Sequence, residues 1–167
     1  MTTTLAGQTL TESTRSFTLT RVIDASPADV YRAWTEAEHL AWFFNPSRPV
    51  PEEPIEADAR PGGEFRVMMD EHEGKRYWAG GRYLELVPDE KVVFEWGARG
   101  GWPDFDEIPH EQRFVCTVLL APVGDGSRAE HVFTCRVPDS MTDAVASDWI
   151  ATGMKQGWAD TISRLAA

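Results

Sequence analysis

The chain has 167 residues, a formal net charge of −11 and 42% hydrophobic residues, with 7 Trp and 8 Phe. This length is typical of one domain with a core of its own. Nucleic acids and anionic membranes both attract basic surfaces, so the acidic balance and the lack of a Lys/Arg cluster argue against either as a partner. No apolar run is long enough to span a membrane and no secretory signal is present, so we expect a cytoplasmic protein.

The N-terminal residues 1–14 are rich in Thr and Ser and show no periodic pattern. Such a segment is typical of a mobile tail, which Leu5 or Leu10 could hold in place. We therefore place a single domain over residues 15–167.

A strand over residues 16–24 should begin the domain, because Phe17 and Leu19 alternate with polar residues. Two short helices should follow. Ser26 is the expected N-cap of the first, with Pro27 in its first turn.

The middle of the chain alternates apolar and polar residues between turn signals, which predicts a run of strands. We expect them over residues 55–60, 64–70, 75–87, 92–96, 112–120 and 128–137. Gly80 and Gly81 inside one strand indicate a bulge or a close approach of another backbone. The segment 97–110 is long for a loop and therefore a candidate functional segment.

Residues 140–165 carry apolar side chains at spacings of three and four, which predicts one long amphipathic helix. Ser140 and Asp143 resemble a capping box at its start. Gly153 and Gly157 should lie on its buried side, where they would let two backbones approach or leave space beneath the helix. Consecutive strands followed by one helix predict an α+β fold, with an antiparallel sheet of six to seven strands wrapped on that helix.

The two cysteines permit a prediction of register. If Asp125 and Gly126 form a two-residue hairpin loop, Cys116 and Cys135 lie directly opposite each other on neighbouring strands. A cytoplasmic location favours two thiols over a disulfide.

Several short motifs occur in the order found in the helix-grip fold, and the chain resembles the START-like or SRPBCC superfamily. The resemblance is greatest to proteins related to the C-terminal domain of the activator of the heat-shock-protein-90 ATPase. The matching stretches are ADVYRAWT (28–35), LAWF (40–43), PGGEFR (61–66), GRYLEL (81–86), VVFEW (92–96) and GW (157–158).

The resemblance implies an incomplete barrel that grips the C-terminal helix, with a pocket between them. It does not choose a function, because the superfamily includes lipid carriers, cyclases and chaperone partners. Two segments depart from the family pattern, namely Phe43-Phe44-Asn45-Pro46 and the long acidic loop around residues 100–109.

A set of mostly large apolar side chains, together with one histidine and two glycines, is predicted to line the pocket, although any one of them could be ordinary core. It consists of Trp34, Trp42, Phe44, Phe65, Val67, Met69, Tyr77, Phe94, Trp96, Trp102, Phe105, His131, Phe133, Trp149, Gly153, Met154 and Gly157.

Polar residues offer few catalytic candidates. His131 lies in phase with Phe133 and Cys135, so it could face the pocket as a general acid or base, or simply be a hydrogen-bonded buried histidine. Four charged residues lie out of phase with the apolar ones and should form a wet outer face: Glu64, Arg66, Glu95 and Arg113. No histidine or cysteine spacing predicts a metal site, and no motif predicts a cofactor.

Three functions remain open. The first is binding of a small hydrophobic or aromatic molecule in the pocket. The second is a cyclase or hydrolase that uses the same pocket. The third, regulation of a chaperone ATPase, ranks last because the protein known for it has a further domain. A homodimer is left open.

Overall fold

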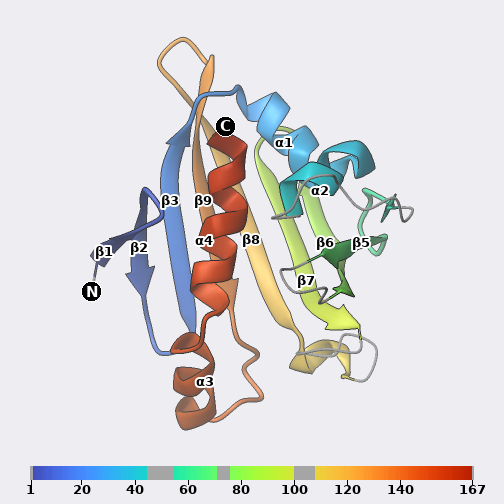
Figure 1. Ribbon diagram of the computed structural model, residues 1–167, viewed down its shortest axis with the longest axis vertical. Helices are drawn as coiled ribbons and strands as arrows, with labels where there is room; N and C mark the ends of the chain where they lie inside the picture. The colour runs from blue at the N-terminus through green and yellow to red at the C-terminus, as the bar shows by residue number, and fades with distance from the viewer. Residues whose placement is uncertain (1, 45–54, 71–75, 100–107, 167) are drawn as a thin grey trace.

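The computed structural model describes residues 2–44, 55–70, 76–99 and 108–166 (Figure 1). One antiparallel sheet runs through them in the order β1-β2-β3-β9-β8-β7-β6-β5-β4. Its strands are β1 (Thr2–Leu5), β2 (Gln8–Glu12), β3 (Ser16–Ile23), β4 (Glu56–Ala57), β5 (Glu64–Asp70), β6 (Arg76–Val87), β7 (Lys91–Arg99), β8 (Phe114–Val123) and β9 (Arg128–Arg136).

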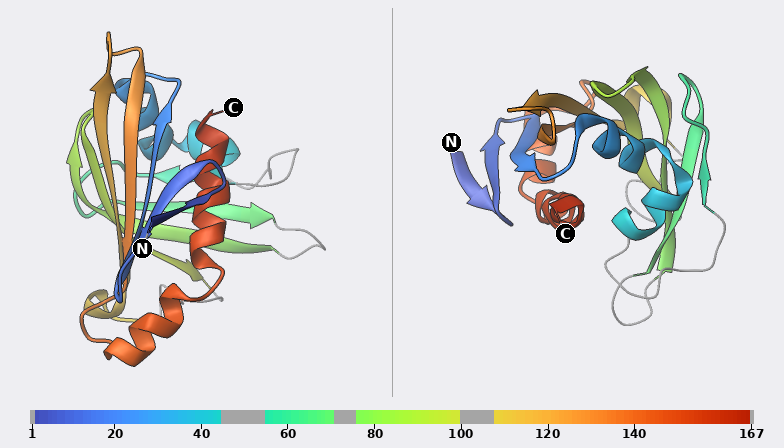
Figure 2. Two further views of the ribbon diagram at one scale, coloured as in Figure 1. Left: turned by 90° about the vertical axis from the view of Figure 1, so that its left-hand side faces the viewer. Right: turned by 90° about the horizontal axis from the view of Figure 1, so that it is seen from above.

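The sheet curves around α4, which lies on its concave side (Figure 2). The helices are α1 (Pro27–Thr35), α2 (Ala37–Phe44), α3 (Asp143–Ile150) and α4 (Met154–Ser163). α1 packs against β8 and β9, whereas α2 packs against β5. The predicted α+β helix-grip arrangement is therefore present. None of the helices in the described part of the chain is long and apolar enough to cross a membrane.

The sheet has nine strands in place of the predicted six to seven, because the segment expected to be a tail forms the hairpin β1–β2. Ala6 and Gly7 make its turn with positive φ values. Leu10 is buried against the core, and the side-chain amide of Gln8 donates a 2.8 Å hydrogen bond to the carbonyl of Ala159 on α4. Contacts with a distant helix thus hold a segment that has little local structural signal.

The predicted single C-terminal helix is wrong in detail, because the chain breaks between α3 and α4. At the break the Thr152 hydroxyl donates a 2.7 Å hydrogen bond to the carbonyl of Trp149, and Gly153 precedes α4. A Thr side chain that bonds the preceding turn competes with regular helix geometry. The N-cap of α3 is Thr142 rather than Ser140. Val145 belongs to the apolar spacing that predicted the long helix and was expected to be buried, but it is 44% exposed.

Other local predictions are confirmed. Ser26 caps α1 by accepting from the backbone N–H of Asp29 at 3.2 Å. Cys116 and Cys135 are directly paired across β8 and β9, and both are buried free thiols. The last paired residues before the hairpin loop are Val123 and Arg128, so the loop is longer than predicted but has the same centre.

The two glycines inside β6 mark a close approach and not a bulge. A Cβ at Gly81 would lie 1.8 Å from the carbonyl oxygen of Glu95 on β7. The register shift in β6 lies further along the strand, between Tyr83 and Glu85.

Candidate functional site

The centre of the concave face is a packed cluster of aromatic rings. Trp34 lies 5.7 Å from Phe94 between ring centroids, and Phe133 lies 4.7 Å from Trp158 on α4. Phe44 and Phe65 meet edge to face at 6.2 Å. Trp34, Phe44, Phe65, Phe94 and Phe133 were all predicted to line a pocket, and here they contact one another. A pocket at these positions stays a prediction.

Four other predicted residues lie at the margin of this cluster and are only half-buried. We call them the aromatic rim: Met69, Tyr77, Trp96 and Trp149. Met69 and Tyr77 are paired across β5 and β6. Phe114 connects the others, because its ring lies 6.1 Å from Trp96 and 5.3 Å from Trp149. The aromatic rim therefore has two parts. One is the pair Met69 and Tyr77 on β5 and β6, and the other is Trp96 and Trp149, where β7 meets α3 next to the break in the C-terminal helix.

The C-terminal residues of the predicted site divide into two groups. Met154, at the start of α4, is buried. Val67, another predicted site residue, is buried on β5. Gly153 and Gly157 are exposed, and a Cβ at either would meet no other atom within 4 Å. The prediction that these glycines lie on the buried side of the helix is wrong, and they allow no close approach of two backbones.

His131 faces the concave side and is completely buried. Its Nε2 accepts a 3.1 Å hydrogen bond from the indole Nε1 of Trp34. Burial lowers the pKa of His131 to about 3, and the nearby Arg21 adds to this effect. The imidazole is therefore neutral near neutral pH, which does not suit a general acid or base working there.

Two polar residues that the sequence did not single out as site residues lie beside His131. Arg21 is its direct partner across β3 and β9. Gln8 occupies the next position across β2 and β3, because Thr9 pairs with Thr20. The sequence feature that could have identified Arg21 is its position in phase with Phe17 and Leu19. No comparable feature marked Gln8, because its segment has no periodic pattern.

The prediction that the outer face of the sheet is exposed to solvent does not hold for Glu95, which is buried there. Its carboxylate lies 2.9 Å from the Arg113 guanidinium and 3.5 Å from that of Arg82 on the neighbouring strand. Arg66 stacks 4.1 Å from the ring centre of Trp78. Charge neutralisation allows a carboxylate to be buried on a face that the alternation assigns to solvent.

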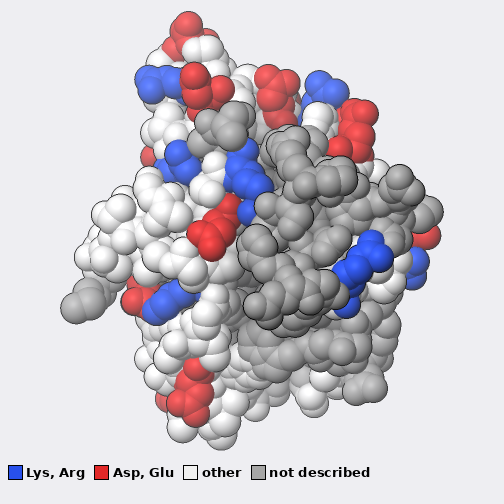
Figure 3. Space-filling model, in the orientation of Figure 1, with Lys and Arg blue, Asp and Glu red and all other residues white. Residues whose placement is uncertain are grey.

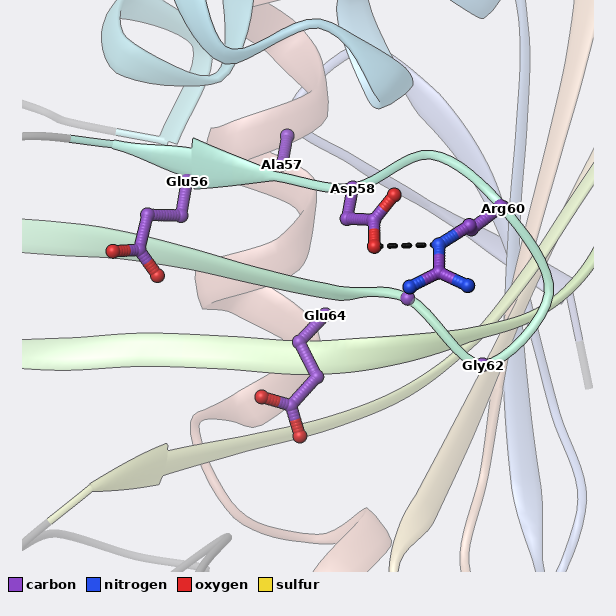
Figure 4. A pocket seen from close by; sticks show the side chains of 7 residues that line it. Glu56, Ala57, Asp58, Arg60, Gly62 and Glu64 are labelled. Carbon is purple, nitrogen blue, oxygen red and sulfur yellow. Dashed lines mark hydrogen bonds and ion pairs between the residues drawn. The ribbon is translucent and has the colours of Figure 1, made fainter.

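A separate hollow of about 470 Å³ lies where β4 turns into β5 (Figure 4). Its lining is Glu56, Ala57, Asp58, Arg60, Gly62, Gly63 and Glu64. Arg60 donates a 2.7 Å hydrogen bond to Asp58 within it. This lining has no aromatic side chain, so the hollow is not the predicted apolar pocket.

Within the described part of the chain, one surface cluster, Glu36, Glu38 and His39, has side chains of metal-ligand type close together. Arg32 already pairs with Glu36 at 2.9 Å. On the face shown in Figure 3, acidic and basic side chains of the described residues are interspersed. The predictions for Trp102, Phe105 and the side chain of Trp42 lie outside the described residues.

The comparisons with known proteins agree with this fold. Residues 24–167 match the model of a family described as activator of Hsp90 ATPase homolog 1-like protein. No curated protein matches the chain.

Solved structures also share this fold. Protein CV1439 from Chromobacterium violaceum is 28% identical, with a TM-score of 0.66, and the match covers 92% of this chain and 96% of that one. A protein from Arthrobacter aurescens has a TM-score of 0.72 at 18% identity, with 94% and 88% covered. PFC0360w, an HSP90 activator from Plasmodium falciparum, has a TM-score of 0.60 at 18% identity, with 90% and 95% covered.

Proposed function

This chain belongs to the family of activator of Hsp90 ATPase homolog 1-like proteins, and on that premise we propose that it binds a small hydrophobic or aromatic molecule between its sheet and its C-terminal helices. The fold alone does not choose this function, because one fold can carry many. The aromatic rim is the observation that supports it.

The rim presents aromatic rings and a thioether that are neither fully buried nor on the convex surface. Met69, Tyr77, Trp96 and Trp149 stay half-buried while the rings beside them are closely packed. Apolar surface left in contact with water costs free energy, about 25 cal/mol per Å². A flat apolar ligand would cover these side chains and recover that free energy, and aromatic side chains with few polar groups are typical of small-molecule sites.

A neutral fluorescent probe, N-phenyl-1-naphthylamine, tests the proposal, because its emission rises in apolar surroundings. Tyr77→Ser should weaken binding of the probe about tenfold, equivalent to about 1.4 kcal/mol. Leu119→Ser is the matched control, because Leu119 is 45% exposed on the convex side of β8. Equal binding by both variants, or no binding by the unaltered protein, would count against the aromatic rim as a ligand site.

Regulation of a chaperone ATPase is the second candidate, and the family description favours it. The Plasmodium falciparum structure is described as an HSP90 activator, and the match covers 95% of it, so the size of this chain does not argue against that role. An ATPase assay with an Hsp90 chaperone separates the two candidates. Stimulation that survives Tyr77→Ser would support the chaperone role without a ligand at the rim.

A further inference from the structure

The outer edge of β1 forms one end of the sheet, and no strand lies beside it in the described part of the chain (Figure 1). We propose that this edge pairs with the same edge of a second copy of the chain, so that two sheets join across a twofold axis. The edge lies at the opposite end of the sheet from β5 and β6. The proposal therefore does not depend on a ligand at the aromatic rim.

The backbone of β1 is open to another strand. An edge strand has a row of N–H and C=O groups that no neighbouring strand bonds, and natural edges are commonly protected by charges, proline, a bulge or very short length. β1 has none of these, because Thr2, Thr3 and Thr4 are exposed and uncharged and its register with β2 is regular over all four residues. Threonine also favours extended backbone. β1 is thus an unprotected edge.

The other end of the sheet, β4, differs in each respect. It is only two residues long, and one of them is the exposed Glu56. The charged pair of Asp58 and Arg60 follows directly after it. Short length and charge discourage the addition of a strand. Of the two ends of this sheet, β1 is therefore the one that a further strand can join.

The charge of the hairpin β1–β2 favours a second copy as the partner. Residues 2–11 contain no charged side chain, although the chain has a net charge of −11 and 26% charged residues. Glu12, the next residue, is already paired with Lys155 on α4. Two copies of so acidic a chain repel each other over most of their surfaces. Contact between copies is favoured where charge is lacking, whereas a basic partner would be attracted to the acidic surfaces elsewhere.

The alternation of side chains along β1 limits the register. Leu5 faces the concave side, because its partner on β2 is the buried Gln8. Thr3 lies on the same side and Thr4 on the opposite one. A continuous sheet requires that paired residues face the same side. With Thr4 opposite Thr4 of the second copy, Thr3 of each copy lies against Leu5 of the other and covers part of this half-buried side chain.

Sedimentation of the full chain tests whether the dimer forms. Four residues make a small interface, so we expect a weak dimer that appears between about 10 μM and 1 mM. Thr4→Lys places two like charges directly opposite each other and should weaken dimerisation at least about fivefold. Thr20→Lys is the matched control, because Thr20 lies in the same row of the convex side, two strands from the edge, and should leave dimerisation unchanged. A monomer throughout this range, or the same dimerisation in both variants, overturns the proposal.

Cysteine cross-linking tests the register. Thr4→Cys should form a disulfide between two copies in oxidised glutathione, and each bond formed releases two molecules of reduced glutathione. Thr3→Cys is the control, because Thr3 lies opposite Leu5 and the two new thiols do not face each other. The native Cys116 and Cys135 are buried and should not react. Cross-linking that is no faster in Thr4→Cys than in Thr3→Cys contradicts this pairing.

The dimer and the proposed ligand site can fail independently. Thr4→Lys should bind N-phenyl-1-naphthylamine as the unaltered protein does, because β1 contributes no residue to the aromatic rim. Loss of dimerisation with unchanged probe binding supports an interface at β1, and loss of both would mean that the substitution disturbs the whole fold and that the interface is not at this edge.

Discussion

The indole Nε1 of Trp34 donates a 3.1 Å hydrogen bond to Nε2 of His131, although 97 positions separate the two residues in the sequence. Their rings are also stacked, with centroids 5.9 Å apart and planes inclined by 12°. The pair joins α1 to β9 in the middle of the core. Because Nε2 accepts this bond, the buried imidazole has to stay neutral.

Acid should therefore destabilise the protein through His131. Its pKa is about 3 in the folded chain, against an ordinary value of 6.5. The unfolded chain takes up the proton first as pH falls, so stability is present above about pH 6.5 and is lost toward pH 3, at about 1.4 kcal/mol per pH unit. Urea unfolding at pH 7 and pH 5 should show a loss about 2 kcal/mol larger than that of His131→Gln.

His131→Gln is the appropriate reference because its side-chain oxygen can accept from Trp34 without titrating. The comparison of the two proteins removes the contributions of the other ionisable groups. An identical pH dependence in both would mean that His131 is not the responsible group.

The glycines of α4 and β6 should respond in opposite directions to alanine. Gly157→Ala should raise stability by about 0.5–1 kcal/mol, because Gly157 is inside a helix and an added Cβ meets nothing within 4 Å. Gly81→Ala should lower stability by about 2 kcal/mol or more, because its Cβ would lie 2.8 Å from the Phe65 ring as well as against Glu95. Thermal or urea unfolding measures both. Destabilisation by Gly157→Ala would place that glycine against the sheet after all.

The buried carboxylate of Glu95 should matter more than an exposed ion pair. Glu95→Gln removes the charge that faces Arg113, whose side chain is 11% exposed, and should cost about 2 kcal/mol. Lys91→Met breaks the exposed pair with Glu85 and should cost less than about 1 kcal/mol. Urea unfolding of both variants gives the comparison. Similar losses would show that Glu95 is effectively solvated.

The features that the sequence predicted correctly depend on neighbouring residues or on counting positions from the centre of a hairpin. The cap Ser26 needs only its own helix, and the pairing of Cys116 with Cys135 follows from the centre of one hairpin. The seven strands expected after the tail all exist, because each shows alternation between turn residues.

The features it missed depend on partners far along the chain. Gln8 looked like part of a tail because its hydrogen-bond partner Ala159 is 151 positions away. Glu95 looked solvent-exposed because alternation does not reveal the two arginines that neutralise it. The helix break at Thr152 was hidden because apolar spacing continues on both sides of it.

By itself the sequence determined the order of elements from β3 to β9 and the family, since these follow from periodicity, turn residues and short motifs in order. Only the tertiary structure decided which aromatic side chains pack together and which remain half-buried at the rim. It also brought Gln8, Arg21 and His131 into one row. The physical reason is that burial and hydrogen-bond satisfaction depend on contacts between distant segments, which the pattern of one segment does not contain.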